Sequence, residues 1–125
     1  MHSSLETAQL CAEGAGGKKA FDILILDLGK LTYIADYFVI CSGSNTTQVG
    51  AIADSIGHTL AKAGIHYSHV EGEAEAKWVL MDYGDVVVHV FEESTRTYYA
   101  LEKLWGDAPR IPVVIRPGEM LGAAS

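Results

Sequence analysis

The Gly43-Ser44 pair is the strongest chemical signal in the sequence, because it stands where an apolar run ends and a helical pattern begins. Backbone amides and the helix dipole at such a junction can bind an anion, including a phosphate group. Transfer of a nucleotide would also need carboxylates close together on neighbouring strands, to hold two metal ions. By itself, Gly43-Ser44 therefore indicates no more than a phosphate or nucleotide site.

The carboxylates of the chain do not supply such a pair. Asp82 and Asp85 flank a turn and belong to different strands of a predicted hairpin. A second group of carboxylates comprises Glu71, Glu73 and Glu75. Gly72 lies within this group and favours a solvated turn rather than a strand face. The pattern is compatible with a degenerate nucleotidyltransferase-like fold that lacks catalytic carboxylates. A nucleotide-binding or nucleotidyltransferase-like module that uses Gly43-Ser44 stays as the alternative hypothesis.

Other motifs that would carry chemistry are incomplete. The glycine-rich residues 14–17 precede Lys18, but Lys19 stands where a phosphate loop needs a hydroxyl, and no strand comes before them. His66 and His69 lie three residues apart, which suits a metal on a helix but places them on opposite faces of a strand. We expect no catalytic residue, no metal site and no cofactor.

A hairpin predicted over residues 77–91 is the element around which the rest of the chain is organised. Two apolar runs, Trp78 to Met81 and Val86 to Phe91, flank a turn that contains glycine. This pattern is typical of two antiparallel strands. The turn Asp82-Tyr83-Gly84 suits a three-residue loop in which Gly84 takes a positive φ.

Both faces of this hairpin are largely apolar. Because successive side chains of a strand point to opposite faces, Trp78 and Leu80 are predicted to share one face of the first strand and Val79 and Met81 the other. In the second strand, Val86, Val88 and Val90 oppose Val87, His89 and Phe91. His89 is then either a hydrogen-bonded core residue or part of a contact surface. Either helices cover both faces, or one face is kept for a partner.

The remaining pattern predicts three helices. Ser4 is predicted to cap a short helix that reaches Glu13, and the glycines after it to form a loop or a weakened helix end. Asn45, with Gln48 at capping-box spacing, begins the best helix, which Gly64 ends. A last helix, capped by Ser94 or Thr95, has its apolar positions at Tyr98, Leu101, Leu104 and Trp105.

Three further strands are predicted over residues 22–28, 37–41 and 65–70, the last of them nearer a sheet edge. With the hairpin they give a single-domain α+β fold with a mixed five-stranded sheet and about three helices. Residues 107–125 hold all three prolines and are predicted to be irregular, although Val113-Val114-Ile115 suits docking against the body.

Composition restricts the classes of partner. The 125 residues carry a formal net charge of −7, from 16 acidic and 9 basic side chains. Because such a chain repels phosphate, we expect no direct, sequence-specific nucleic-acid binding and regard a basic protein as the better partner. Cys11 and Cys41 are expected to be reduced, with Cys41 packed as a small hydrophobe. Without a signal peptide or a membrane-spanning segment, the expected compartment is the cytoplasm.

Large aromatic side chains gather after residue 77. They are Trp78, Tyr83, Tyr98, Tyr99 and Trp105. One interpretation is that they fill the core, since a five-stranded sheet needs cover on both sides. The other is that a partly uncovered sheet face uses them as interface anchors. The pattern leaves both open for Trp78 and favours the core for Trp105.

Several motifs together resemble the family of ribosomal silencing factors, also called Iojap or YbeB proteins. They are Ala35-Asp-Tyr-Phe-Val-Ile-Cys-Ser-Gly43, then Gln48, Ala51-Ile-Ala-Asp54 and Glu71-Gly72, and then Trp78 to Phe91 and Tyr99 to Ala108. The resemblance divides the chain into a variable N-terminal segment (1–17), the family domain (18–110) and an irregular tail (111–125).

The resemblance implies a translation repressor without enzymatic activity. Members of the family are expected to bind the large ribosomal subunit through its ribosomal protein number fourteen and to block joining of the small subunit by bulk. They are also expected to form homodimers in isolation. Carried over by position, the partner-binding residues are Trp78, Leu80, Met81, Asp82, Tyr83, His89, Arg96 and Tyr99. A dimerisation module of another assembly is a further hypothesis.

Overall fold

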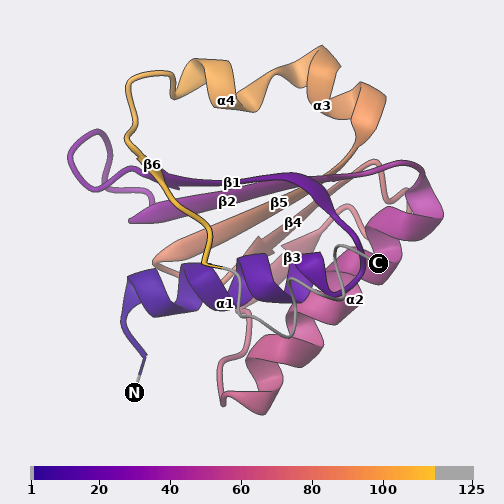
Figure 1. Cartoon of the computed structure of the whole chain (residues 1–125), viewed down its shortest axis with the longest axis horizontal. Helices are drawn as coiled ribbons and strands as arrows, with labels where there is room; N and C mark the ends of the chain where they lie inside the picture. Colours follow the sequence, from indigo (N-terminus) through magenta and orange to yellow (C-terminus); the bar gives the residue numbers. More distant parts are fainter. Residues whose placement is uncertain (1, 115–125) are drawn as a thin grey trace.

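A computed structural model describes residues 2–114, which form one mixed sheet with helices on both faces (Figure 1). The strand order is β3-β4-β5-β2-β1-β6. The strands are β1 (Phe21–Asp27), β2 (Tyr37–Gly43), β3 (His69–Glu71), β4 (Trp78–Asp82), β5 (Val86–Glu92) and β6 (Arg110–Ile111). β2 and β5 are parallel, and the other neighbouring strands are antiparallel. The predicted α+β fold with a mixed sheet is confirmed, but the predicted count of five strands is one too few.

The additional strand is β6, at the edge beside β1. Its two residues lie between Pro109 and Pro112, so they carry no strand pattern in the sequence. Gln9 of the first helix then holds the chain, because its side chain donates to the Pro112 carbonyl and accepts from the Val114 amide, both at 2.9 Å. Val113 packs against the core, as predicted. Ile115 of the same prediction lies outside the described residues.

The hairpin formed by β4 and β5 has the predicted faces. Trp78 pairs with Phe91, and Leu80 pairs with His89. Gly84 has the predicted positive φ (+89°), but β4 continues through Asp82, so the loop lies one residue later than expected. β3 occupies the predicted edge of the sheet but is shorter than the predicted strand over residues 65–70.

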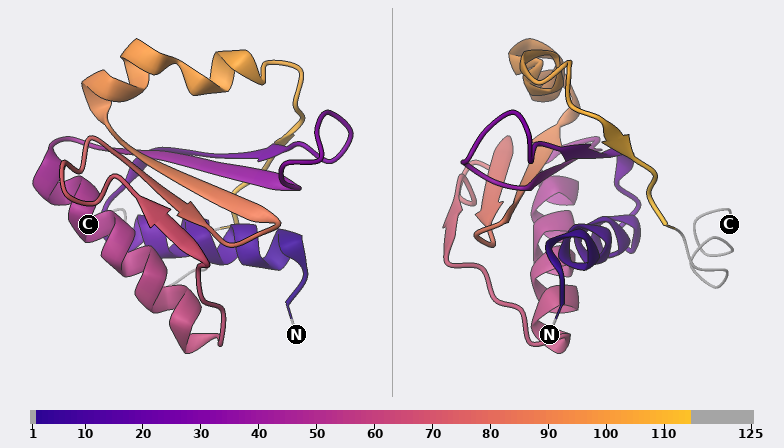
Figure 2. Two further views of the ribbon diagram at one scale, coloured as in Figure 1. Left: turned by 180° about the vertical axis from the view of Figure 1, so that it is seen from behind. Right: turned by 90° about the vertical axis from the view of Figure 1, so that its left-hand side faces the viewer.

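Helices α1 (Ser4–Gly16) and α2 (Thr46–Lys62) lie side by side on one face of the sheet (Figures 1 and 2). Asn45 caps α2 as predicted, with its Oδ1 accepting from the Gln48 amide at 2.8 Å. The chain leaves the helix at Gly64, whose φ is +80°. The two helices cover a core that includes Val79, Met81, Val86, Val88 and Val90 of the hairpin.

Of the two alternatives for the glycines near the end of α1, the loop is wrong, because the helix passes Gly14 and ends at Gly16, with Gly17 as its C-cap. Ser3, not the predicted Ser4, caps the helix, through a capping box with Glu6. A Cβ at position 14 would lie 2.9 Å from the Ile56 Cα atom of α2. A glycine within a helix has a conformational cost. At position 14 it lets α1 and α2 pack closely, because no Cβ stands between them.

Both cysteines belong to this core and are free. Burial raises the pKa of the Cys41 thiol to about 12 and also raises the pKa of Cys11. The prediction that Cys41 packs as a small hydrophobe is confirmed. Neither thiol has the exposed, electropositive surroundings of a reactive cysteine.

Helices α3 (Glu93–Tyr99) and α4 (Leu101–Leu104) lie over the opposite face (Figure 2). Glu92, not Ser94 or Thr95, caps α3, and its bonds to these two residues lower its pKa to about 2. Ala100, with φ +48°, breaks the single helix that was predicted. Below α4, Leu101 and Trp105 pack on Leu26, Phe38 and Ile40.

No helix within residues 2–114 is long and apolar enough to cross a membrane.

Candidate functional site

An aromatic cluster occupies the sheet face beneath α3. The Trp78 ring centroid lies 4.8 Å from that of Phe91 and 5.0 Å from that of Tyr99. The His89 ring lies 4.5 Å from that of Phe38, edge to face. Because the chain pairs Trp78 directly with Phe91, the start of β4 and the end of β5 together place the indole next to α3.

A hydrogen bond fixes the Trp78 indole. Its Nε1 donates to His89 Nδ1 at 3.1 Å. Burial lowers the pKa of His89 to about 4, so the ring is neutral at pH 7. With Nδ1 as the acceptor, the proton of the neutral ring is on Nε2, and this buried atom has no partner among the described residues. His89 is therefore the hydrogen-bonded core histidine of the two predicted alternatives.

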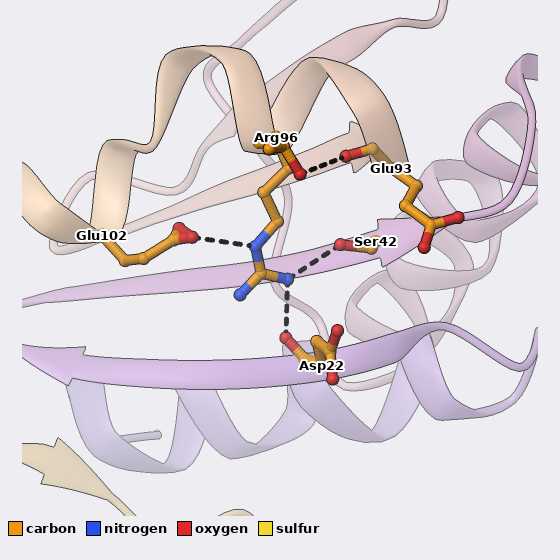
Figure 3. Close-up of polar contacts among 6 residues, drawn as sticks. Asp22, Ser42, Glu93, Arg96 and Glu102 are labelled. Carbon is orange, nitrogen blue, oxygen red and sulfur yellow. Dashed lines mark hydrogen bonds and ion pairs between the residues drawn. The ribbon is translucent and has the colours of Figure 1, made fainter.

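Arg96 fastens α3 to the sheet (Figure 3). Its Nη1 donates to the Asp22 carbonyl at 2.7 Å and to Ser42 Oγ at 2.8 Å, and its Nε donates to Glu102 at 3.3 Å. The guanidinium thus joins α3 to β1, β2 and α4. The Arg96 side chain is 13% exposed. Its Nε and Nη1 atoms donate to groups within the protein rather than to solvent.

The Asp22 carbonyl is available to Arg96 because β1 is irregular there. Phe21 pairs with Ser42 and Leu24 with Ile40, so β1 holds one extra residue. Asp22 has φ +50°, as a residue in a β-bulge can have. A bulge thus leaves a backbone acceptor outside the ladder, and the arginine of α3 uses it.

A groove of about 800 Å³ lies beside the indole. Its lining includes the aromatic side chains of Trp78, Tyr98 and Tyr99 and residues of the segment from Gly72 to Lys77. Tyr98 is 81% exposed and Tyr99 is 55% exposed, while Trp78 is half-buried. This arrangement offers aromatic surface at the rim of a groove, which is typical of interface anchors.

The predicted partner-binding residues do not form one surface. Trp78, Leu80, His89, Arg96 and Tyr99 lie on the α3 side of the sheet. Met81 and Tyr83 lie on the α1–α2 side, where Met81 is 2% exposed. Asp82 ends β4 and accepts from the Gly84 amide. In this conformation Met81 and His89 support the hairpin from within, and Trp78, Leu80, Asp82, Tyr83 and Tyr99 retain exposed surface.

Tyr98 and Leu104 are exposed, although helical spacing predicted them to face the core. The break at Ala100 takes Tyr98 out of phase with Leu101 and Trp105, which pack on the sheet, and α4 ends at Leu104. Ala100 is not a glycine and has no turn motif around it, so the sequence carries no signal for the break. Tyr98 joins the groove through this break, 5.0 Å from the ring of Tyr99.

The Gly43-Ser44 junction uses two of its backbone donors within the chain. The Ser44 amide donates to Gln48 Oε1 at 2.6 Å, and the Gln48 amide donates to Asn45. The Gln48 side-chain amide in turn donates to the carbonyls of Lys18 and Lys19, which cover the junction. A phosphate would have to displace these side chains, so the geometry does not favour the alternative of a nucleotide site.

Across residues 2–114, no group of three or more His, Cys, Asp or Glu side chains is placed to hold a metal ion. His69 Nε2 lies 3.1 Å from Glu71 on the exposed edge strand.

Comparison with known proteins decides the family. The model of the family described as "Ribosomal silencing factor during starvation" matches residues 1–122. The chain belongs to this family. The ribosomal silencing factor RsfS of Bacillus subtilis is 50% identical over 101 residues, which are 81% of this chain and 86% of that protein. The matched range contains both the N-terminal helix and residues after 110, and the division of the chain at 17 and 110 stays a prediction.

A solved structure and a plant relative agree with this assignment. A crystal structure of a Chromobacterium violaceum protein superposes with a TM-score of 0.82 at 35% identity, covering 92% of this chain and 95% of that one. The chloroplast protein Iojap of Zea mays is 34% identical over 109 residues, which are 86% of this chain and 46% of Iojap. Membership of the ribosomal silencing factors supports repression of translation, with the ribosome as the partner.

Proposed function

We propose that this chain binds the large ribosomal subunit through ribosomal protein number fourteen and sterically blocks joining of the small subunit. The proposed site of action is the cytoplasm, and the proposed mechanism involves no catalysis. Docking uses the α3 side of the sheet, where Trp78, Tyr98 and Tyr99 rim a groove. This exposed aromatic rim is the observation that carries the proposal.

The energetics of the rim suit a steric blocker. Trp78 is already oriented by His89 and packed against Phe91, so little side-chain entropy is lost when a partner covers it. Aromatic anchors of this kind dominate many interfaces. A net charge of −7 also favours approach to basic ribosomal proteins. Fast approach and slow release are what a protein needs in order to occupy a subunit surface.

The same rim supplies a surface for a second copy of the chain. Tyr98, Tyr99 and Leu104 are all more than half exposed on α3 and α4. We propose that the free protein forms a homodimer through this surface and that the large subunit competes for it. Light scattering after gel filtration should show a dimer that becomes a monomer in the Tyr98→Ser/Tyr99→Ser variant. A variant that remains dimeric would place the dimer contact elsewhere.

The docking proposal is tested by a Trp78→Ala variant in binding to purified large subunits. We expect its dissociation constant to rise about thirtyfold, since loss of an aromatic anchor costs about 2 kcal/mol. Tyr67→Ala is the matched control, because Tyr67 is also an exposed aromatic (43%) but lies on the α2 side, beside Tyr83. Circular dichroism confirms that each variant is folded. A folded Trp78→Ala protein that binds as tightly as the Tyr67→Ala control would contradict the proposal.

A further inference from the structure

The loop between β1 and β2, residues 28–36, is a second place where large apolar side chains meet solvent. Leu31 is 45% exposed, Ile34 is 68% exposed and Tyr33 is fully exposed. Scattered exposed hydrophobic residues are ordinary, but three within four residues of one loop form a patch that needs a reason. None of them is used by the aromatic rim around Trp78.

The loop presents these side chains on an anchored frame. The Leu28 amide donates to the Asp36 carbonyl at 2.8 Å and closes the base of the loop. Leu28 and Ala35 are buried in the core on the α3–α4 side. The Ile34 amide donates to Thr32 Oγ1 at 3.1 Å within the loop. Both ends are therefore tied to the sheet while the residues between them face outward.

Carboxylates surround the base of this loop. Ser4 Oγ donates to Asp36 at 2.9 Å and lies 3.4 Å from Asp85, which brings the two aspartates together. Asp27 lines the same hollow as Asp36 and the half-exposed Leu5. Lys30 is the one basic residue in the loop itself. The apolar patch thus has an acidic border.

This end of the molecule is distinct from the aromatic rim. Tyr37, just after the loop, pairs with Val86, whereas Trp78 pairs with Phe91 at the other end of β5. Five residues of strand separate the two positions, or about 17 Å. A partner that touched only the rim would leave the loop uncovered.

We propose that the β1–β2 loop is a second docking surface, which receives a basic protein segment carrying an apolar side chain. Leu31, Tyr33 and Ile34 would bury the apolar group, and Asp27, Asp36 and Asp85 would face its positive charges. An RNA segment does not fit, because its phosphates would meet these carboxylates. The inference rests on the proposed function in one respect, since it places the segment on a protein of the large subunit.

Photo-crosslinking tests the identity of the occupant. A Tyr33→p-benzoylphenylalanine variant is bound to purified large subunits and irradiated, and the adduct is mapped by mass spectrometry. The expected adduct is a lysine- or arginine-rich segment of a ribosomal protein. The matched control carries the probe at Thr47, which is exposed at the opposite end of the sheet, and should not give the peptide adduct that the probe at position 33 gives. Adducts to ribosomal RNA or to a second copy of the chain, or no adduct on saturated subunits, would overturn the inference.

Binding measurements separate this inference from the docking proposal. The Leu31→Ser/Tyr33→Ser/Ile34→Ser variant replaces exposed side chains only, and its dissociation constant for large subunits should rise at least tenfold. If this variant binds normally while Trp78→Ala is weakened, the loop inference fails and the docking proposal stands. If the triple variant is weakened and Trp78→Ala is not, the rim fails and the loop stands. Normal binding by both variants would overturn both.

Discussion

His89 orients Trp78 and is itself almost completely buried. It is 4% exposed, and it accepts the hydrogen bond that sets the orientation of the indole. Protonation would remove that acceptor and place a charge among Phe38, Phe91 and Trp78. The site therefore depends on a histidine that stays neutral, which burial ensures at physiological pH.

The neutral histidine predicts a pH dependence of stability. The pKa of His89 falls from its ordinary 6.5 to about 4 in the folded protein, so the unfolded chain takes up the proton first as the pH falls. The contribution of neutral His89 to the free energy of unfolding is fully present above pH 6.5 and is lost as the pH falls toward 4. Between pH 7 and 4.5 the wild type should lose about 2 to 3 kcal/mol more than a His89→Gln variant.

Urea unfolding at the two pH values measures this difference. His58→Gln is the control, because His58 is exposed on α2, and it should follow the wild-type profile. Equal losses for the wild type and His89→Gln would show that the ring is not held neutral by burial.

At the scale of elements, the contact between α1 and α2 depends on one missing side chain. In a Gly14→Ala variant the new Cβ would meet Ile56 Cα at 2.9 Å and the Thr59 side chain at 3.1 Å. We expect a loss of about 1 to 3 kcal/mol from overpacking. Gly16→Ala is the matched control, since nothing lies within 4 Å of its added Cβ, and its helix propensity should leave stability unchanged or slightly improved. Equal effects in thermal unfolding would mean that the helices can separate at little cost.

Arg96 holds α3 and α4 on the sheet, so its removal should loosen these two helices. Arg96→Met would leave Glu102, which is 23% exposed, without its cation, and Ser42 and the Asp22 carbonyl without their donor. We expect a loss of about 2 to 3 kcal/mol. The double variant Arg96→Met/Glu102→Leu should recover a large part of it, because no charge is then left unpaired. Hydrogen exchange over residues 93–104 should follow the same order, and unchanged exchange in Arg96→Met would contradict this role.

The sequence predicted those elements whose pattern is local. Alternation along Trp78–Met81 and Val86–Phe91 correctly separated the two faces of each strand, and Asn45 and Gly64 correctly bounded α2. Contacts between distant segments account for what was missed. α1 passes through its glycines because α2 is close to Gly14, and β6 exists because Ile25 pairs with Ile111.

The candidate site shows the same division. Alternation grouped Trp78 with Leu80 on one strand and His89 with Phe91 on the other, and the pairing of the two strands in the structure puts both groups on one face. The hydrogen bond from Arg96 to the Asp22 carbonyl depends on a bulge at Asp22. The exposure of Tyr98 depends on a break at Ala100. Neither irregularity has a residue signal, because Asp22 and Ala100 take positive φ values without being glycine.

For the whole molecule, the net charge of −7 should govern the rate of association. We expect the association rate with large subunits to fall as ionic strength rises. Asp82→Lys places a positive charge on the hairpin beside the docking face and should slow association and weaken its salt dependence. Lys62→Gln, at the exposed end of α2, serves as a charge-changing control and should leave the rate unchanged or slightly faster. Stopped-flow rates that do not vary with salt would exclude steering by charge.

The most direct test of the central claim is a subunit-joining assay with purified small and large subunits, followed by light scattering. Added wild-type protein should prevent joining in proportion to its occupancy of the large subunit. Trp78→Ala, with its fold intact, should need about thirtyfold more protein for the same effect, whereas Tyr67→Ala should match the wild type. Normal joining on subunits saturated with wild-type protein would contradict the claim that this chain silences ribosomes by occupying the subunit surface.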